Sequence, residues 1–215
     1  MEPSIDAAEF TDILQELLRQ PLPINRYRRK VGLGRSNTFG IVSRRCLSPD
    51  YSRLCWNRPL LYKHLLDFGQ KFCPFPFTSI TVNESFRAGL HYDKGNDGNS
   101  LLVGFGDYTN GELQIVGGDL SGNYNIQHRP LICDFTTNLH QVLPFEGQRY
   151  SLVFYNIRRP VLGGILPVPS VKKDDNKWFF YRGDEKITRK TGLPHPLRRP
   201  KIVSSSGVPV VVSFK

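Results

Sequence analysis

The stretch FTSITVNESFRAGLHYD, residues 77–93, decides the fold, because apolar and β-branched residues begin here to alternate with polar ones. This period of two predicts strands over 77–83 and 86–91, joined by a turn at Glu84 and Ser85. Further short strands follow between turns rich in glycine and asparagine, over residues 101–105, 112–116, 130–135, 141–143 and 149–157. Many short strands with such turns predict a sandwich or barrel rather than a parallel sheet.

Three side chains in and after this stretch form a candidate metal site. His91 and Asp93 are two residues apart, so on a strand they lie on one face. His140, from a later strand, would add a third ligand. Two imidazoles and one carboxylate leave one face of an octahedral metal open, which suits non-haem Fe(II). Each residue alone is more often structural, so the prediction depends on their joint occurrence in this order.

Two residues farther along predict a position for a carboxylate ligand. Arg149 and Ser151 share one face of the predicted strand 149–157. A guanidinium fork beside a hydroxyl can hold a carboxylate through parallel hydrogen bonds. Asn83 is a polar residue at the end of an otherwise apolar strand, and we expect it to face the same pocket.

Taken in order, these positions resemble the Fe(II)/2-oxoglutarate dioxygenase superfamily: His91-x-Asp93, then His140, then Arg149-x-Ser151. The resemblance covers roughly residues 77–157 and implies a double-stranded β-helix, or jelly roll, in a mainly β chain with flanking helices. It implies Fe(II) on the two histidines and the aspartate. It further implies 2-oxoglutarate as cosubstrate, with Arg149 pairing its distal carboxylate and Ser151 adding a hydrogen bond, and ascorbate as an optional addition.

Two branches of this superfamily are resembled, and they imply different substrates. The phrase HYDKGNDGNS, residues 91–100, looks like the TET/JBP branch, which oxidises 5-methylpyrimidines in nucleic acid. The phrase HQVLPFEGQRYSLVF, residues 140–154, is similar to the end of the prolyl-4-hydroxylase core. NGEL, residues 110–113, resembles that group's Gly-Gly-Glu-Leu, with Asn110 departing from the first glycine.

The leading hypothesis is therefore a dioxygenase that hydroxylates a nucleic acid and releases succinate and carbon dioxide. A protein or peptide hydroxylase is the alternative. A non-catalytic binding module on the same fold is a third class, which the intact ligand set argues against. The sequence does not give the oligomeric state.

The charge distribution favours the nucleic-acid hypothesis. The formal net charge is +10, yet residues 76–156 hold four basic and eight acidic residues. The excess lies in the flanks: residues 19–49 hold eight basic residues and no acid, and 157–215 hold thirteen basic and four acidic residues. Such flanks can neutralise phosphates around an acidic centre, although solvated surfaces are the simpler explanation. The candidate substrate contacts are Lys94, Asn96, Asn99, Tyr108, Arg28 and Arg29.

The flanks of the core predict helices and a basic extension within a single domain, 1–215. Residues 1–76 form a helical and basic support, with an amphipathic helix over 4–19 capped by Ser4 and a second helix over 59–72 that starts at Pro59. Residues 77–157 form the catalytic core. Residues 158–215 form the extension, with strands expected over 178–181 and 208–214.

Cysteine usage and the absence of apolar runs predict an intracellular protein, cytoplasmic or nuclear. The four cysteines show no CxxC and no zinc-type spacing, so we expect reduced thiols. No apolar run is long enough to span a bilayer, and the first twenty residues carry acids rather than a secretion signal. No membrane partner is expected.

Overall fold

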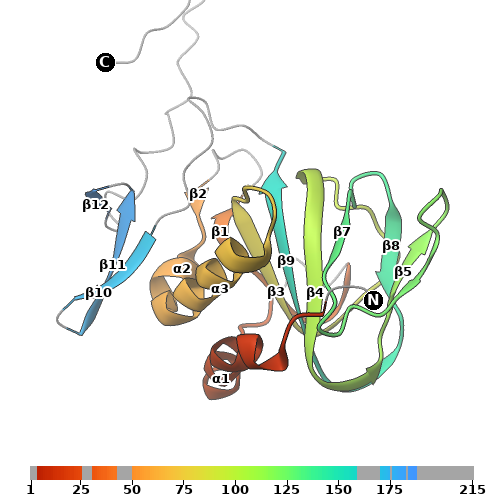
Figure 1. The fold of residues 1–215 in the computed structure, drawn as a ribbon, viewed down its shortest axis with the longest axis horizontal. Helices are drawn as coiled ribbons and strands as arrows, with labels where there is room; N and C mark the ends of the chain where they lie inside the picture. The colour runs from red at the N-terminus through yellow and green to blue at the C-terminus, as the bar shows by residue number, and fades with distance from the viewer. Residues whose placement is uncertain are drawn as a thin grey trace, which may run out of the picture.

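A computed structural model describes residues 4–25, 31–42, 50–158, 170–174, 176–182 and 184–187. Within these residues the chain is mainly antiparallel β-strand, with helices gathered on one side (Figure 1). The helical elements are a 3-10 turn at Ala7–Phe10, α1 (Thr11–Arg19), α2 (Arg53–Asn57) and α3 (Pro59–Phe72). In the described ranges no helix has the length and apolar character needed to cross a membrane.

Among the described residues the strands form three antiparallel sheets. The large sheet has the order β2-β1-β3-β9-β4-β7, whose bounds are Asp50–Tyr51, Gly32–Val42, Ser79–Ala88, Phe145–Ile157, Asn96–Asn110 and Leu131–Cys133. The small sheet has the order β6-β5-β8, with bounds Gly122–Tyr124, Leu113–Val116 and Leu139–Val142. The third has the order β10-β11-β12, with bounds Ser170–Asp174, Lys177–Arg182 and Glu185–Ile187.

Alternation along the central strands divides their side chains between two layers. Leu152 and Phe154 of β9 belong to the main core, which joins the large sheet to helix residues such as Phe10, Leu61 and Leu65. Ser151 and Val153 point to the opposite face and line a pocket together with residues of the small sheet. The helices therefore cover one face of the large sheet, and the small sheet covers the other. The candidate site lies between the two sheets.

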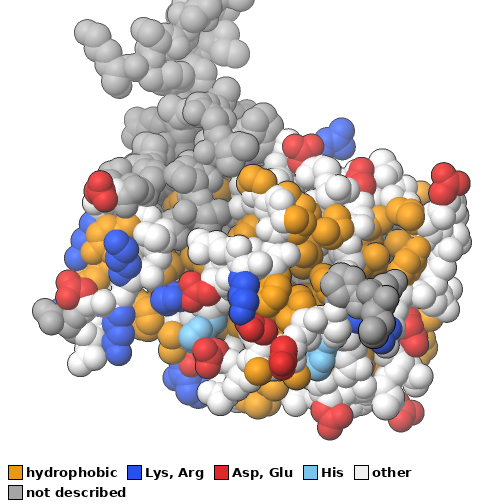
Figure 2. Space-filling model, viewed as in Figure 1, with side chains coloured by type: hydrophobic (Ala, Val, Ile, Leu, Met, Phe, Trp, Pro, Cys, Tyr) orange, Lys and Arg blue, Asp and Glu red, His pale blue; other side chains and the backbone are white. Residues whose placement is uncertain are grey.

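Charges of both signs are mixed on the helical face, which Figure 2 shows. Several are paired: Lys71 Nζ lies 2.6 Å from Glu9 Oε1, Arg19 Nη2 lies 2.8 Å from Glu16 Oε2, and Lys63 pairs with Asp67. Exposed pairs of this kind contribute little to stability, at most about 1 kcal/mol each. The described part of this face is therefore a mixed, solvated surface rather than a patch of one sign.

The helix over 59–72 is confirmed, with Pro59 at its first turn. The predicted start of the N-terminal helix over 4–19 was wrong. The helical backbone begins at Ala7, and Asp6 rather than Ser4 caps it, since the Asp6 carboxylate accepts a hydrogen bond from the Ala8 N–H. A 3-10 turn precedes α1, so the amphipathic α-helix is shorter than predicted.

Two predicted turns are strand in the structure. β3 runs through Glu84 and Ser85, and Ser85 takes a φ of 46° where the register with β1 shifts. β4 continues from Asn96 to Asn110, because residues 106–110 pair with 145–149 of β9. Both corrections have one cause: pairing with a neighbouring strand outweighed the local turn chemistry.

Segments outside 77–157 also build the fold. β1 is an eleven-residue strand paired with β3, within the segment 1–76 that was expected to be a helical and basic support. The strand predicted over 178–181 is confirmed within β11, and Phe180 packs on Trp56 with ring centroids 4.4 Å apart. The strand predicted over 208–214 lies outside the described residues.

Candidate metal centre

His91 and His140 are brought together by backbone pairing. They form an antiparallel bridge in which each N–H donates to the other residue's carbonyl, at 2.9 and 3.0 Å. Directly opposed residues of such a pair project their side chains to the same face. The imidazole centroids consequently lie 4.3 Å apart.

Backbone carbonyls fix the tautomer of both histidines. His91 Nδ1 lies 2.7 Å from the Gly89 carbonyl oxygen, and His140 Nδ1 lies 3.0 Å from that of Asn138. A carbonyl only accepts, so Nδ1 carries a proton in each ring, and in the neutral imidazole Nε2 keeps its lone pair. Metal-binding histidines are commonly oriented by such a contact on the far nitrogen. Both rings are therefore prepared to bind a metal through Nε2.

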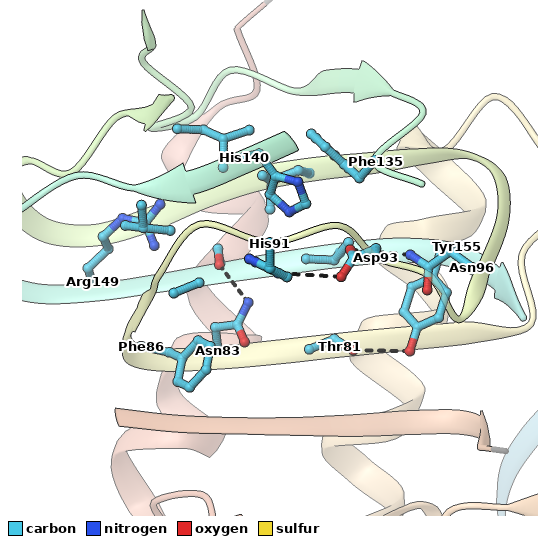
Figure 3. Close-up of a pocket in the computed structure, with 16 residues that line it drawn as sticks. Thr81, Asn83, Phe86, His91, Asp93, Asn96, Phe135, His140, Arg149 and Tyr155 are labelled. Carbon is cyan, nitrogen blue, oxygen red and sulfur yellow. Dashed lines mark hydrogen bonds and ion pairs between the residues drawn. The ribbon is translucent and has the colours of Figure 1, made fainter. Parts of the chain in front are cut away.

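Asp93 completes the cluster from the same segment. Its backbone N–H donates to the Phe135 carbonyl at 2.9 Å, and its Oδ1 lies 3.5 Å from His91 Nε2. One ligand atom from each of Asp93, His91 and His140 lies within 4.8 Å of the others. Figure 3 shows the three side chains pointing toward one another. Donor atoms at this spacing can contact a single ion.

Burial keeps His140 in the form that binds metals. Its side chain lies in the interior, and burial lowers the pKa of the imidazole. The hydrogen bond to Asn138 opposes this shift, and the nearby His91 adds to it. A neutral imidazole is the ligand form, so the pocket favours metal binding at neutral pH.

Arg149 lies in the same pocket, toward its other end in Figure 3. Its side chain is only 1% exposed. Nε donates to the Gly111 carbonyl at 3.2 Å, and the guanidinium carbon lies 5.4 Å from the Tyr108 ring centroid and 5.6 Å from that of Phe145. Nη2 is buried without a hydrogen-bond partner. A buried guanidinium with an unused donor is prepared for an anion.

Burial also lowers the pKa of Arg149, and the neighbouring Tyr108 partly offsets that effect. A guanidinium stays charged even so. The described part of the chain shows no ion pair between Arg149 and an acid. The charge is therefore held in place by one carbonyl and two ring faces, which leaves it available to a ligand.

Ser151 and Asn83 join the pocket from adjacent strands. They are paired in the register of β9 and β3, and Asn83 Nδ2 donates to Ser151 Oγ at 3.1 Å. The remaining wall is largely apolar, with Leu102, Leu113, Val142 and Val153 among its residues. Polar groups thus occupy defined points of an otherwise apolar pocket, as in small-molecule sites.

The predicted substrate contacts occupy different positions. Lys94 is exposed at the mouth, where it lines a groove that also contains His91 and Asp93. Asn99 is exposed and outside both pockets, whereas Asn96 is buried beside Asp93. Tyr108 is buried against Arg149 rather than at the mouth. Arg28 and Arg29 lie outside the described residues.

Sequence reasoning missed a chain of hydroxyls in the pocket wall. Tyr155 lines both the pocket and the mouth groove, and its hydroxyl lies 3.3 Å from Thr81 Oγ1. Thr81 Oγ1 in turn lies 3.0 Å from Thr38 Oγ1. The signal was present for Tyr155, because it continues the alternation of Arg149 and Ser151 along one strand face.

No protein-family model matches the sequence, and no curated protein matches it. Among solved structures, the chain is similar to NgTET1 in complex with 5mC DNA, at a TM-score of 0.52 and 13% identity over 71% of this chain and 67% of that one. A 2OG-Fe(II) oxygenase family oxidoreductase from Burkholderia pseudomallei follows at 0.47, with 18% identity over 71% and 81%. A Pseudomonas putida prolyl-4-hydroxylase follows at 0.46, with 14% identity over 74% and 90%. The predicted fold is confirmed: a mainly β chain with flanking helices and a jelly-roll core.

Proposed function

We propose that this chain is a single-domain Fe(II)- and 2-oxoglutarate-dependent dioxygenase. One observation carries the proposal: a His-Asp-His cluster and a buried guanidinium with an unused donor line the same pocket. Either feature alone has structural explanations. Together they supply a metal site and a carboxylate site within one apolar wall, which is the demand of a metal-chelating dicarboxylate.

The residues present fit both groups. Two imidazoles and one carboxylate suit Fe(II) and leave coordination positions open. His91, Asp93 and His140 would hold the metal. Arg149 Nη2, buried without a partner, would hold the distal carboxylate of 2-oxoglutarate, with Ser151 and Asn83 beside it on the same wall. When bound, iron and 2-oxoglutarate supply the oxidising power for hydroxylation with dioxygen, releasing succinate and carbon dioxide.

The protein's own residues would orient the ligands and exclude water. The carbonyls of Gly89 and Asn138 would hold the imidazoles so that each Nε2 is available to the metal. The Arg149 cation offsets the cost of placing a carboxylate in an apolar pocket, since an unpaired buried anion is strongly disfavoured. The apolar walls keep bulk water from the reacting centre.

We further propose that the substrate is a nucleic acid, with a 5-methylpyrimidine as the oxidised base. The basic flanks support this, and the basic segment 26–30 joins directly to Val31, which lines the mouth groove. Lys94 and Tyr92 line the same groove, where a cation and an exposed ring suit a phosphate and a base. NgTET1, which shares the fold, was solved with 5mC DNA. A peptide hydroxylase is the alternative, and the similarity of residues 140–154 to the prolyl-4-hydroxylase core supports it.

Turnover assays would test both levels of the proposal. The purified protein is incubated with Fe(II), 2-oxoglutarate and ascorbate, and succinate is measured with methylated and unmethylated DNA or RNA, or with proline-containing peptides. We expect succinate to rise with methylated nucleic acid and to vanish in His140→Ala. Succinate only with peptides would overturn the substrate assignment. No 2-oxoglutarate turnover and no metal binding under any condition would overturn the dioxygenase assignment.

Nucleic-acid affinity should fall steeply with salt if phosphates are contacted. A protein that releases several counterions loses roughly 10³- to 10⁵-fold in affinity between 50 and 200 mM salt. The measurement is fluorescence anisotropy with a labelled oligonucleotide across that range. Salt-independent or absent binding at low salt would contradict the nucleic-acid version alone.

A further inference from the structure

Asn96 lies directly behind one of the candidate metal ligands. Its Nδ2 donates to Asp93 Oδ2 at 3.4 Å, while Asp93 Oδ1 faces His91 Nε2 at 3.5 Å. The two carboxylate oxygens of Asp93 therefore face different partners. One faces the imidazole of the candidate ligand His91, and the other accepts a hydrogen bond from a neutral amide.

The surroundings of Asn96 fix this arrangement. Its side chain is 8% exposed, and its backbone N–H donates to the Asp93 carbonyl at 3.0 Å, which closes a tight turn. Nδ2 also donates to Ser100 Oγ at 3.3 Å, and Ser100 is fully buried. The residue pairs with Ile157 of β9 at the start of β4. Asn96 thus belongs to the paired strand β4 rather than to the loop that precedes it.

The hydrogen-bonding capacity of the amide limits its role. An asparagine amide has two N–H donors, and the two contacts above go to Asp93 and Ser100. No donor is left for a substrate. Asn99, three residues on, is exposed and lies outside the pocket, so it provides a matched asparagine without this contact.

We infer that Asn96 is a positioning residue: it holds the Asp93 carboxylate in the orientation that binds the metal through one oxygen. The inference rests on the proposed function, and it replaces the substrate contact that the sequence suggested for Asn96. A neutral donor restrains the carboxylate without adding a charge that would compete for the metal. Outer partners of this kind typically alter metal affinity by about 10- to 100-fold.

The test measures metal binding, which needs no known substrate. The dissociation constant for Mn(II) is determined by electron paramagnetic resonance of the free ion, for wild type, Asn96→Ala, Asn96→Leu and Asn99→Ala. Leucine has the same branched skeleton of four side-chain heavy atoms as asparagine, and it fills the buried space without a donor. We expect both Asn96 variants to bind Mn(II) about 10- to 100-fold more weakly, and Asn99→Ala to match wild type.

A spectroscopic readout separates positioning from a general loss of structure. The visible absorption of Co(II)-loaded protein should change in shape in Asn96→Leu, because the carboxylate is free to rotate, while the melting temperature of the metal-free variant stays near wild type. Wild-type Mn(II) affinity in both Asn96 variants would overturn the inference. Absence of metal binding in the wild type would instead overturn the proposed function.

Discussion

Replacing Arg149 with methionine should separate the stability of the ligand-free protein from its response to 2-oxoglutarate. The guanidinium is 1% exposed and is compensated by one carbonyl and two ring faces. Exchanging buried charges for apolar groups of similar volume often stabilises proteins by about 1–4 kcal/mol. The lost ring contacts cost about 1–2 kcal/mol. The net expectation lies between a loss of about 1 kcal/mol and a gain of about 3 kcal/mol in the free energy of unfolding.

The stabilisation by 2-oxoglutarate should instead be lost in this variant. With Mn(II) present and 2-oxoglutarate at a hundredfold excess over its dissociation constant, the wild type gains about 2.7 kcal/mol. For a domain of this size that corresponds to about 5–10 °C in melting temperature. Arg149→Met should show no such shift. Arg149→Lys keeps the charge but not the planar fork, so its shift should be intermediate.

Thermal melts with and without 2-oxoglutarate provide the assay, and Arg129→Met is the control because Arg129 is exposed and lies outside the pocket. A wild-type shift in Arg149→Met would refute the assignment of this residue to the carboxylate. If the ligand-free variant lost more than about 3 kcal/mol in free energy of unfolding, the guanidinium would be a structural contact. That result would refute the argument that it is available to bind a ligand.

Three further outcomes follow. Gly111 and Gly117 both have positive φ, 73° and 81°, but a Cβ at Gly111 would lie 2.7 Å from Phe145 and 3.1 Å from Arg149, whereas Gly117 has open space. Gly117→Ala should cost only the backbone strain, about 1 kcal/mol, while Gly111→Ala should also weaken 2-oxoglutarate binding in the melt assay. The lowered pKa of His140 means that the unfolded chain binds a proton first as pH falls, so the metal-free protein should lose stability between pH 7 and 5. Urea midpoints should show this loss, and His140→Gln should reduce it. Chelation by EDTA should lower the melting temperature of the metal-loaded wild type but leave His140→Ala unchanged; equal responses would contradict the metal assignment.

That the candidate residues lie together in one pocket was more predictable than the bounds of the strands that carry them. Alternation predicted that Arg149 and Ser151 share a face, because period two is a property of any extended chain. The same alternation did not predict where β3 and β4 end. Their predicted turns contain glycine and serine, yet Glu84 pairs with Arg35 and Tyr150, and residues 106–110 pair with 145–149, all far away in sequence.

The positions of the candidate substrate contacts were harder to predict than those of the candidate metal ligands. In the sequence, Asn96 and Asn99 each follow a glycine, so local composition does not separate them. Only the sheet register shows that Asn96 is buried and Asn99 is exposed. Tyr108 shows the same difficulty. Its packing against Arg149 depends on the pairing of β4 with β9, which local composition does not encode.

The reciprocal bridge between His91 and His140 has a consequence for the hydrogen exchange of their backbone amides. Each amide hydrogen can exchange with solvent only when its hydrogen bond to the other residue's carbonyl breaks. The two amides should therefore exchange at a common rate. A metal bound to both imidazoles would link the segment that carries His91 to β8 of the small sheet, and metal binding should therefore slow the exchange of both amides together.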